Sequence, residues 1–280
     1  MVRTNHNTLA WVGGVVYTHE NFESTDQSAD QNIEALLGVQ YKMFRFDRYN
    51  LQSQLLVYPG LTDAGRVRAT AHLGELVDVD LVIESVVEDL AAKRALFSEL
   101  DSVCKPETIL ATNTSTLPVV EMAMATGRPD LVCGIHFFNP APAMALVEVV
   151  RPITASDATI AAAVSFASAC GKDPVEVKDQ AGFIVNALLF PYLNNAVRLL
   201  EQGVATKEGI DAAMKGGCGF PMGPFALLDL VGLDTSLAIL DALYDEFKDP
   251  NYAAMPLLRR MVAAEQLGRK SGRGFLDYRK

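Results

Sequence analysis

Apolar and polar positions follow a regular order between residues 80 and 178, and this order predicts strands separated by helices. Residues 81–83 form a short apolar run bounded by acids, whereas residues 90–100 place apolar side chains at helical spacing beside charged ones. By the same criteria we expect further strands at 108–111, 131–137, 146–150 and 175–177, and helices at 118–125 and 156–171. Strands that alternate with helices predict a largely parallel sheet covered on both faces, the doubly wound α/β class.

Beyond residue 179 the pattern changes, and only helical periodicity remains. We expect helices at 183–201, 207–215, 225–231, 235–247 and 256–266, the second of them capped by Thr206. The sequence therefore predicts two domains: an α/β domain over residues 1–179 and an all-α domain over residues 180–280.

The first 60 residues differ in character from the remainder of the chain. They hold ten Asn plus Gln and three Ala, whereas residues 61–280 hold nine Asn plus Gln and thirty-two Ala. The pattern here suggests strands at 12–17 and 43–46 and a short helix at 29–39, without a sustained amphipathic period. Because the composition shifts so abruptly, we interpret the first 60 residues separately from the remainder of the chain.

Composition excludes several classes of function. Thirty-four acidic against 24 basic side chains give a net charge of −10, so no basic field is present to hold a nucleic acid. No apolar run approaches the roughly 20 residues that a membrane span needs, and the first residues do not resemble a secretion signal. We therefore expect a soluble, cytoplasmic protein without a membrane partner.

The four cysteines match no metal motif, because Cys104, Cys133, Cys170 and Cys218 are 29, 37 and 48 residues apart. This spacing fits neither a zinc knuckle nor a small disulfide-rich fold. We expect reduced, buried thiols and no metal site.

Polar side chains follow the predicted strands where each strand ends. Glu88 comes after the first strand, residues 113–116 (Asn-Thr-Ser-Thr) after the second, and residues 136–140 (His-Phe-Phe-Asn-Pro) close the third. Ligands of doubly wound sheets bind beyond the carboxyl ends of the strands, so these residues are candidates for a site. Each of them taken singly also fits a helix cap or a turn.

His136 and Glu148 are the most informative pair. A neutral imidazole is well suited to move a proton near neutral pH, although a lone histidine can equally be structural. Glu148 lies in an otherwise apolar strand, where a carboxylate needs a partner. Pro140 and Pro142 make the intervening segment a turn, so the two strands can lie side by side and the acid can fix the imidazole tautomer.

Two other features allow more than one interpretation. Asn186 lies at the start of a helix, where it is either exposed or directed at a ligand. The basic loop at residues 268–272 (Gly-Arg-Lys-Ser-Gly) is either surface or able to reach an anion.

Seven segments together resemble the L-3-hydroxyacyl-CoA dehydrogenase family, which includes the bacterial 3-hydroxybutyryl-CoA dehydrogenases. The resemblance runs from about Leu61 to the C-terminus. Its segments are DLVIE through ED at 80–89, NTST at 113–116, HFFNPAPAM from 136, LVEVV from 146, GFIVNALLFPYLNNAVRLLEQGVA from 182, PMGPFALLDLVGLDT from 221 and LGRKSGRGFLDY from 267. Several long motifs in the family's order are far more specific than one short pattern.

The resemblance implies a Rossmann-like domain that binds NAD, an acyl-CoA substrate, and a helical domain that forms a homodimer and contributes to the substrate pocket. It implies that His136 is the general base and that Glu148 holds and polarises it. Ser115 and Asn186 would place the substrate oxygens. The residues implied to contact or support the cofactor are Glu88, Lys93, Asn113, Ser115, Asn139 and Lys270. Thr116 stands where the family often has serine, and the hydroxyl is kept.

The sequence departs from the family at its beginning. The family opens with a strand and a G-x-G-x-x-G turn that lets the backbone approach the cofactor's pyrophosphate. Here the nearest candidate, Gly13-Gly14, has no third glycine at the required offset. Asp47 lies 34 residues beyond Gly13, too far to be the acid of this fingerprint.

Three explanations of the first 60 residues remain open: a shifted reading frame or mispredicted start, a cap on a protein that has lost dinucleotide binding, or a divergent first βαβ unit. A frame error predicts no consistent core there, whereas a divergent unit predicts packing against the strand at Leu81. Two alternatives to the dehydrogenase function follow. One is a catalytically impaired member or non-catalytic dimeric scaffold, and the other is a β-hydroxyacid or glycerol-phosphate dehydrogenase on the same plan.

Overall fold

The computed structural model describes residues 7–17, 33–44, 50–57, 70 and 72–279, with side chains described only for residue 70 and residues 72–279. The chain separates into two compact units: residues 1–114 with 119–176, and residues 115–118 with 177–280. We call them unit 1 and unit 2 and describe each by itself.

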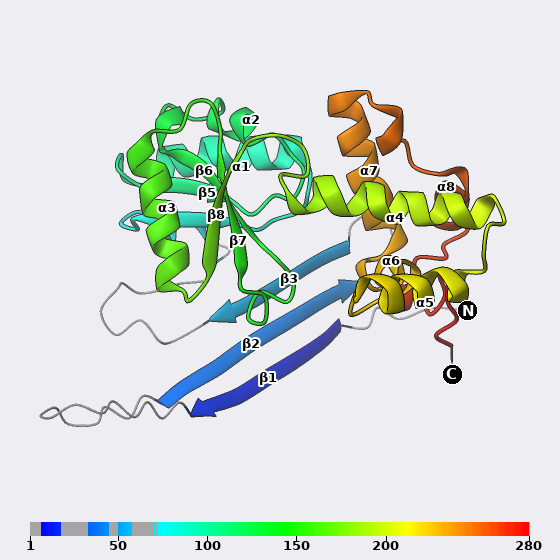
Figure 1. Ribbon diagram of the computed structural model, residues 1–280. Coiled ribbons are helices and arrows are strands. Elements are labelled where there is room, and N and C mark those ends of the chain that lie inside the picture. Colours follow the sequence, from blue (N-terminus) through cyan, green and yellow to red (C-terminus); the bar gives the residue numbers. More distant parts are fainter. Residues whose placement is uncertain (1–6, 18–32, 45–49, 58–69, 71, 280) are drawn as a thin grey trace, which may run out of the picture. The chain divides into compact units, whose positions relative to one another are not determined.

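Unit 1 contains a five-stranded sheet whose strands follow one another in the order β4-β5-β6-β7-β8 (Figure 1). Its strands are β4 (Leu81–Glu84), β5 (Ile109–Thr112), β6 (Val132–Phe137), β7 (Leu146–Arg151) and β8 (Asp173–Lys178). Its helices are α1 (Leu90–Val103), α2 (Val119–Ala123) and α3 (Asp157–Ala169), with short 3-10 turns η1 (Leu73–Glu75) and η2 (Pro129–Leu131). The expected α/β class is confirmed. The pairs β4–β5 and β5–β6 are parallel, while β6–β7 is antiparallel because a short turn joins the two strands.

Helices cover both faces of this sheet (Figure 1). On one face α3 packs on alternate residues of the strands, among them Ala111, Cys133 and Val149. The opposite face receives α1 and α2; Val119 of α2, for example, lies near Gly134 of β6. Because side chains alternate along a strand, every second residue of β4 to β7 points to this second face.

Polar side chains cap several helices, and the cap predicted at Thr206 is one of them. Ser156 accepts a hydrogen bond from the amide of Thr159 at the start of α3, and Asp89 accepts one from Ala92 at the start of α1. In unit 2, Thr206 caps the helix that follows it.

Unit 2 is helical. It comprises α4 (Val185–Glu201), α5 (Lys207–Cys218), α6 (Pro224–Val231), α7 (Leu233–Phe247) and α8 (Pro256–Ala263), with 3-10 turns η3 (Pro250–Tyr252) and η4 (Arg269–Ser271). These helices share a single apolar core that includes Leu193, Phe225, Leu228 and Leu240. The predicted helices are confirmed, with ends shifted by at most three residues.

The N-terminal segment folds unlike the family's opening. Its strands β1 (Asn7–Tyr17), β2 (Ile33–Phe44) and β3 (Asn50–Val57) form an antiparallel sheet in consecutive order, the blue arrows of Figure 1. The helix expected at 29–39 is wrong over residues 33–39, because Gly38 and the alternating apolar residues after it favour a strand. Residues 29–32 lie outside the described residues, as does Asp47.

A divergent first βαβ unit would consist of parallel strands joined by a helix. The described strands of this segment pair antiparallel, and none of them pairs with β4. That explanation is therefore wrong for the strands that the structure describes.

The four cysteines are free, as expected. Cys104 and Cys133 are buried, but Cys170 and Cys218 are exposed, so the expectation of burial is wrong for these two. Both lie in or directly after the last turn of a surface helix, where one side is open to solvent. Burial raises the pKa of the Cys133 thiol to about 12, which makes it unreactive.

None of the helices within the described ranges is long and apolar enough to cross a membrane.

Candidate active site

The face of the sheet that α1 and α2 cover becomes polar at the carboxyl ends of the strands. Residues Glu84, Thr112, Gly134 and Val150 occupy one row across β4 to β7, as the strand register shows. Glycine is required in this row because a Cβ at Gly134 would lie 2.7 Å from the Cβ of Val150. Two residues further along, the next row places His136 opposite Glu148.

The predicted contact between His136 and Glu148 is present. Nδ1 of the imidazole lies 2.8 Å from Oε2 of the carboxylate, and the two side chains are 5% and 1% exposed. The antiparallel pairing of β6 and β7 places these residues directly opposite each other, so the backbone itself fixes their distance. The ring of Phe138 packs against the imidazole, with ring centroids 4.6 Å apart.

This geometry decides which imidazole nitrogen is basic. A carboxylate can only accept a hydrogen bond, so Nδ1 of His136 carries the hydrogen and Nε2 is the nitrogen that can take a proton. Glu148 also stabilises the positive charge that forms when it does so. The pair can therefore act as a general base held in one orientation.

The residues expected on the cofactor side of unit 1 lie at the ends of β4 and β5. Glu88 is 40% exposed, whereas Lys93 is only 1% exposed and its ammonium lies 3.3 Å from the Glu88 carboxylate. Asn113 follows β5, and its Oδ1 accepts a hydrogen bond from the amide of Phe137 at the end of β6. Asn139 is exposed in the loop after β6.

Unit 2 holds the other predicted residues. Nδ2 of Asn186, at the start of α4, lies 3.5 Å from the carbonyl oxygen of Ser115, so the structure brings these two residues together. Asn186 is 8% exposed, which argues against the solvent-facing interpretation. Lys270 in η4 is half-exposed and forms an ion pair with Asp234 of α7 at 2.5 Å.

Three polar residues of unit 1 were not predicted as site residues from the sequence. Glu84 and Thr112 are buried beside Lys93; an acid at the end of an apolar strand was the available signal, as for Glu148. The ammonium of Lys172 donates to the carbonyl oxygens of Ala141 and Met144 and so holds the loop that carries Asn139. No sequence pattern pointed to Lys172.

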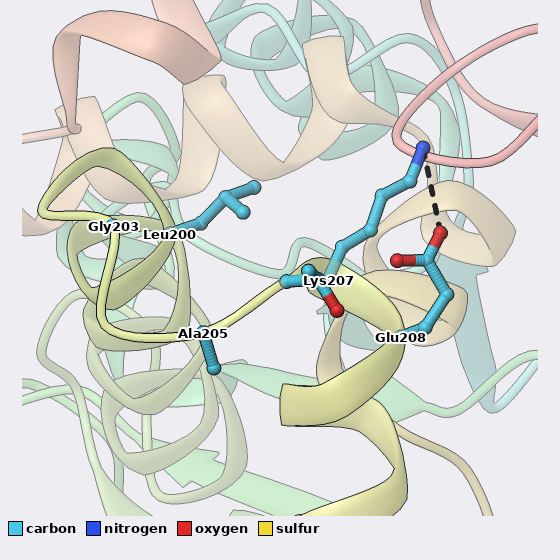
Figure 2. A pocket seen from close by; sticks show the side chains of 6 residues that line it. Leu200, Gly203, Ala205, Lys207 and Glu208 are labelled. Atoms are coloured by element: carbon cyan, nitrogen blue, oxygen red, sulfur yellow. Dashed lines mark ion pairs between the residues drawn. The ribbon is translucent and has the colours of Figure 1, made fainter.

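A pocket lies elsewhere, in unit 2, at the turn between α4 and α5 (Figure 2). It is lined by Leu200, Gly203, Ala205, Thr206, Lys207 and Glu208. Thr206 caps α5, and Lys207 donates to the carbonyl oxygen of Phe275 and lies 3.9 Å from Glu208. These polar groups serve the fold, so the pocket offers no chemistry comparable to that of His136 and Glu148.

Within the described part of the chain no group of side chains has the composition of a metal site. For NAD, the residues present fit one end of the cofactor. Glu88 and Asn113 offer polar side chains at the carboxyl edge of the sheet, where a nicotinamide would meet the His136 strand. Among residues 7–17, 33–44 and 50–57, which the structure describes, the strands β1 to β3 pair antiparallel, whereas the βαβ motif that receives a pyrophosphate has parallel strands.

Comparisons with known proteins agree with the motifs. The NAD binding domain of 3-hydroxyacyl-CoA dehydrogenases matches residues 14–180, starting before Leu61, and the C-terminal domain of these enzymes matches residues 182–278. The chain is 50% identical over 214 residues to 3-hydroxybutyryl-CoA dehydrogenase of Clostridioides difficile, with 76% of each chain covered. It is 49% identical over 201 residues to human mitochondrial hydroxyacyl-coenzyme A dehydrogenase, covering 71% of this chain and 64% of the human one.

A solved structure supports the same assignment. The (S)-3-hydroxybutyryl-CoA dehydrogenase PaaH1 from Ralstonia eutropha has a TM-score of 0.73 to this chain at 44% identity, with 75% of each chain covered. Both domains are thus matched by one group of oxidoreductases. The chain belongs to the 3-hydroxyacyl-CoA dehydrogenase family.

Proposed function

We propose that the chain catalyses the NAD-dependent oxidation of an L-3-hydroxyacyl-CoA, such as 3-hydroxybutyryl-CoA, to the 3-oxoacyl-CoA, or the reverse reaction. The observation that carries this proposal is the buried His136–Glu148 pair, which joins a proton acceptor to an acid that orients it. The relatives' printed names supply the substrate class.

In the oxidation, Nε2 of His136 removes the proton of the 3-hydroxyl group. Glu148 keeps Nδ1 protonated and stabilises the imidazolium that results. Burial of both side chains strengthens their interaction, because little water competes for it. Bound NAD would supply the acceptor for the hydride that leaves C3 of the substrate.

Other residues bind and orient. We assign Ser115 and Asn186 to the substrate oxygens, because Asn186 is buried and its amide already reaches Ser115. Glu88, Asn113 and Asn139 would hold the nicotinamide end of the cofactor, and Lys270 would approach it from η4. We assign Lys93 to the nicotinamide side of the cofactor together with Glu88, its neighbour at 3.3 Å.

We further propose the division into an NAD-binding domain, residues 1–179, and a helical domain, residues 180–280, that supplies the substrate pocket and a homodimer contact in the cytoplasm. Exposed apolar side chains on α4, such as Leu188 at 72% exposure, support a protein contact there. The net charge of −10 argues against a nucleic acid as partner. Light scattering on the purified chain would test the dimer, and a monomer would contradict it.

The first experiment is calorimetric titration of the 280-residue chain with NADH, followed by acetoacetyl-CoA reduction in the same preparation. We expect both binding and turnover. A folded chain that neither binds NADH nor reduces acetoacetyl-CoA would contradict the proposal and favour the non-catalytic scaffold.

A further inference from the structure

The side chains around Lys93 form a closed network at the carboxyl end of β4 and β5. The Lys93 ammonium lies 2.7 Å from Oε1 of Glu84 and 3.3 Å from Oε2 of Glu88. Oε2 of Glu84 accepts a hydrogen bond from Thr112 at 2.8 Å, and Thr114 donates to Glu88 at 2.5 Å. The amide of Thr114 in turn donates to the hydroxyl of Thr112 at 3.2 Å, which completes the ring.

The position of Lys93 is unfavourable for a cation in two respects. It lies in the first turn of α1, where the helix dipole disfavours a cation, and its side chain is 1% exposed, where an unpaired ammonium is costly. A residue that violates local preferences in this way is expected where function requires it.

Glu84 compensates the buried charge of Lys93. Its side chain is 1% exposed, and each carboxylate oxygen is occupied: Oε1 by Lys93 and by the amide of Val86 at 2.6 Å, and Oε2 by Thr112. Glu84 therefore fixes both the ammonium and the start of the segment that leads to Glu88. Glu88, at 40% exposure, is the only one of the three charged groups with a surface open to a ligand.

We propose that Glu84 is a positioning residue for cofactor binding. It anchors Lys93, and the Lys93 ammonium fixes the Glu88 carboxylate so that it accepts a hydrogen bond from a hydroxyl or carboxamide donor at the nicotinamide end of NAD. The inference rests on the proposed function. It assigns Glu84 and Lys93 to the binding of the cofactor, a role distinct from the proton transfer at His136.

The test compares steady-state constants of the full chain with Glu84→Gln, which keeps the size of the side chain and removes its charge. We expect KM for NAD to rise about tenfold, the effect of losing one charge-assisted hydrogen bond, while kcat and KM for the acyl-CoA change less than about twofold. A merely structural role would lower the melting temperature without this selective change in KM.

Asp101→Asn is the matched control. Asp101 lies at the other end of α1 and pairs with Arg128 at 2.7 Å, in a half-buried ion pair of the same unit. Its loss should lower the melting temperature and leave KM for NAD unchanged. An equal rise in KM in both variants would overturn the inference, because a general loss of stability would then explain the result.

A double-mutant cycle tests the order of the relay. If Glu84 acts through Lys93, Lys93→Met should raise KM for NAD by a similar factor, and Glu84→Gln in that background should add less than about twofold. Independent, multiplying effects would overturn the relay.

The remaining outcomes of these experiments also decide for or against the inference. Should Glu84→Gln fail to fold, Thr112→Val removes one hydrogen bond to Glu84 at nearly constant volume; a rise of about threefold in KM for NAD supports the inference, and an unchanged value overturns it. An active wild type with unchanged KM in Glu84→Gln refutes the inference alone. A wild type that neither binds NADH nor turns over removes the proposed function and this inference with it.

Discussion

The buried polar side chains of the two units differ in what they bind. At the carboxyl edge of the sheet in unit 1 they bind one another, as in the pairs His136–Glu148 and Glu84–Lys93, and Glu84 accepts in addition from the amide of Val86. In unit 2 they bind the backbone: Asn194 accepts from the amide of Met255 and donates to the carbonyl oxygen of Ala253, and Asp229 accepts from two amides of the C-terminal segment.

This difference distinguishes buried side chains that serve the reaction from buried side chains that serve the fold. A buried side chain that satisfies a backbone group is needed by the fold, since that group would otherwise stay unpaired. Two buried side chains that satisfy only each other can often be replaced by well-packed apolar residues of similar volume at little cost to the fold. Within unit 1, Thr108 and Thr159 lie away from the carboxyl edge, and both donate to backbone carbonyl groups. In unit 1 the buried pairs assigned to chemistry therefore lie at one edge of the sheet, whereas Ser115, Asn186 and Lys270, which are also assigned to the ligands, belong to unit 2.

The largest expected effect follows from His136→Gln. Loss of the general base should lower kcat by about 10²- to 10⁴-fold, because glutamine cannot accept the proton at neutral pH. Its amide can still donate to Glu148, so the melting temperature should change little. His72→Gln, at an exposed histidine of the same unit, is the control and should leave both quantities unchanged. A His136→Gln variant that keeps most of its kcat would refute the assignment.

A smaller effect is expected for Glu148→Gln. The amide oxygen can still accept from Nδ1 and hold the ring, but the charge that stabilises the imidazolium is lost, so kcat should fall by about 10- to 100-fold. Glu176→Gln removes an exposed carboxylate that pairs with Arg151, and it should have no effect on kcat. In the His136→Gln background Glu148→Gln should cost little more, because the two residues act as one unit. Additive losses would mean that Glu148 acts independently of the histidine.

The sequence predicted the contact between His136 and Glu148 for a physical reason. An acid in an apolar strand and a histidine at the end of its neighbour each needed an explanation, and the two-proline turn between them brought the strands together. Helices and strands from residue 80 onward followed from periodicity and caps. The motifs then favoured 3-hydroxyacyl-CoA dehydrogenases over the other two-domain dehydrogenases, and the family match agrees.

Other features were beyond prediction from sequence. The network of Glu84 and Lys93 depends on a contact between a strand end and the first turn of a helix, nine residues apart in the chain, that no periodicity reveals. Lys172 bonds to the loop after β6 although the two are 31 residues apart in the chain. At the N-terminus the pattern was weak, and a strand was mistaken for a helix where Gly38 should have weighed more.

The smallest effect tests the architectural side of the comparison. Asn194 is buried at 1% exposure in α4 and satisfies two backbone groups beside η3. Asn194→Ala should lower the free energy of unfolding by about 1–3 kcal/mol in urea, because both groups lose their partner. Asn195→Ala changes the exposed neighbour in the same helix and should shift it by less than about 0.5 kcal/mol. Turnover per folded molecule should stay at the wild-type value in both variants. A selective loss of kcat in Asn194→Ala at unchanged stability would contradict the division, because a residue assigned to the architecture alone would then take part in the chemistry.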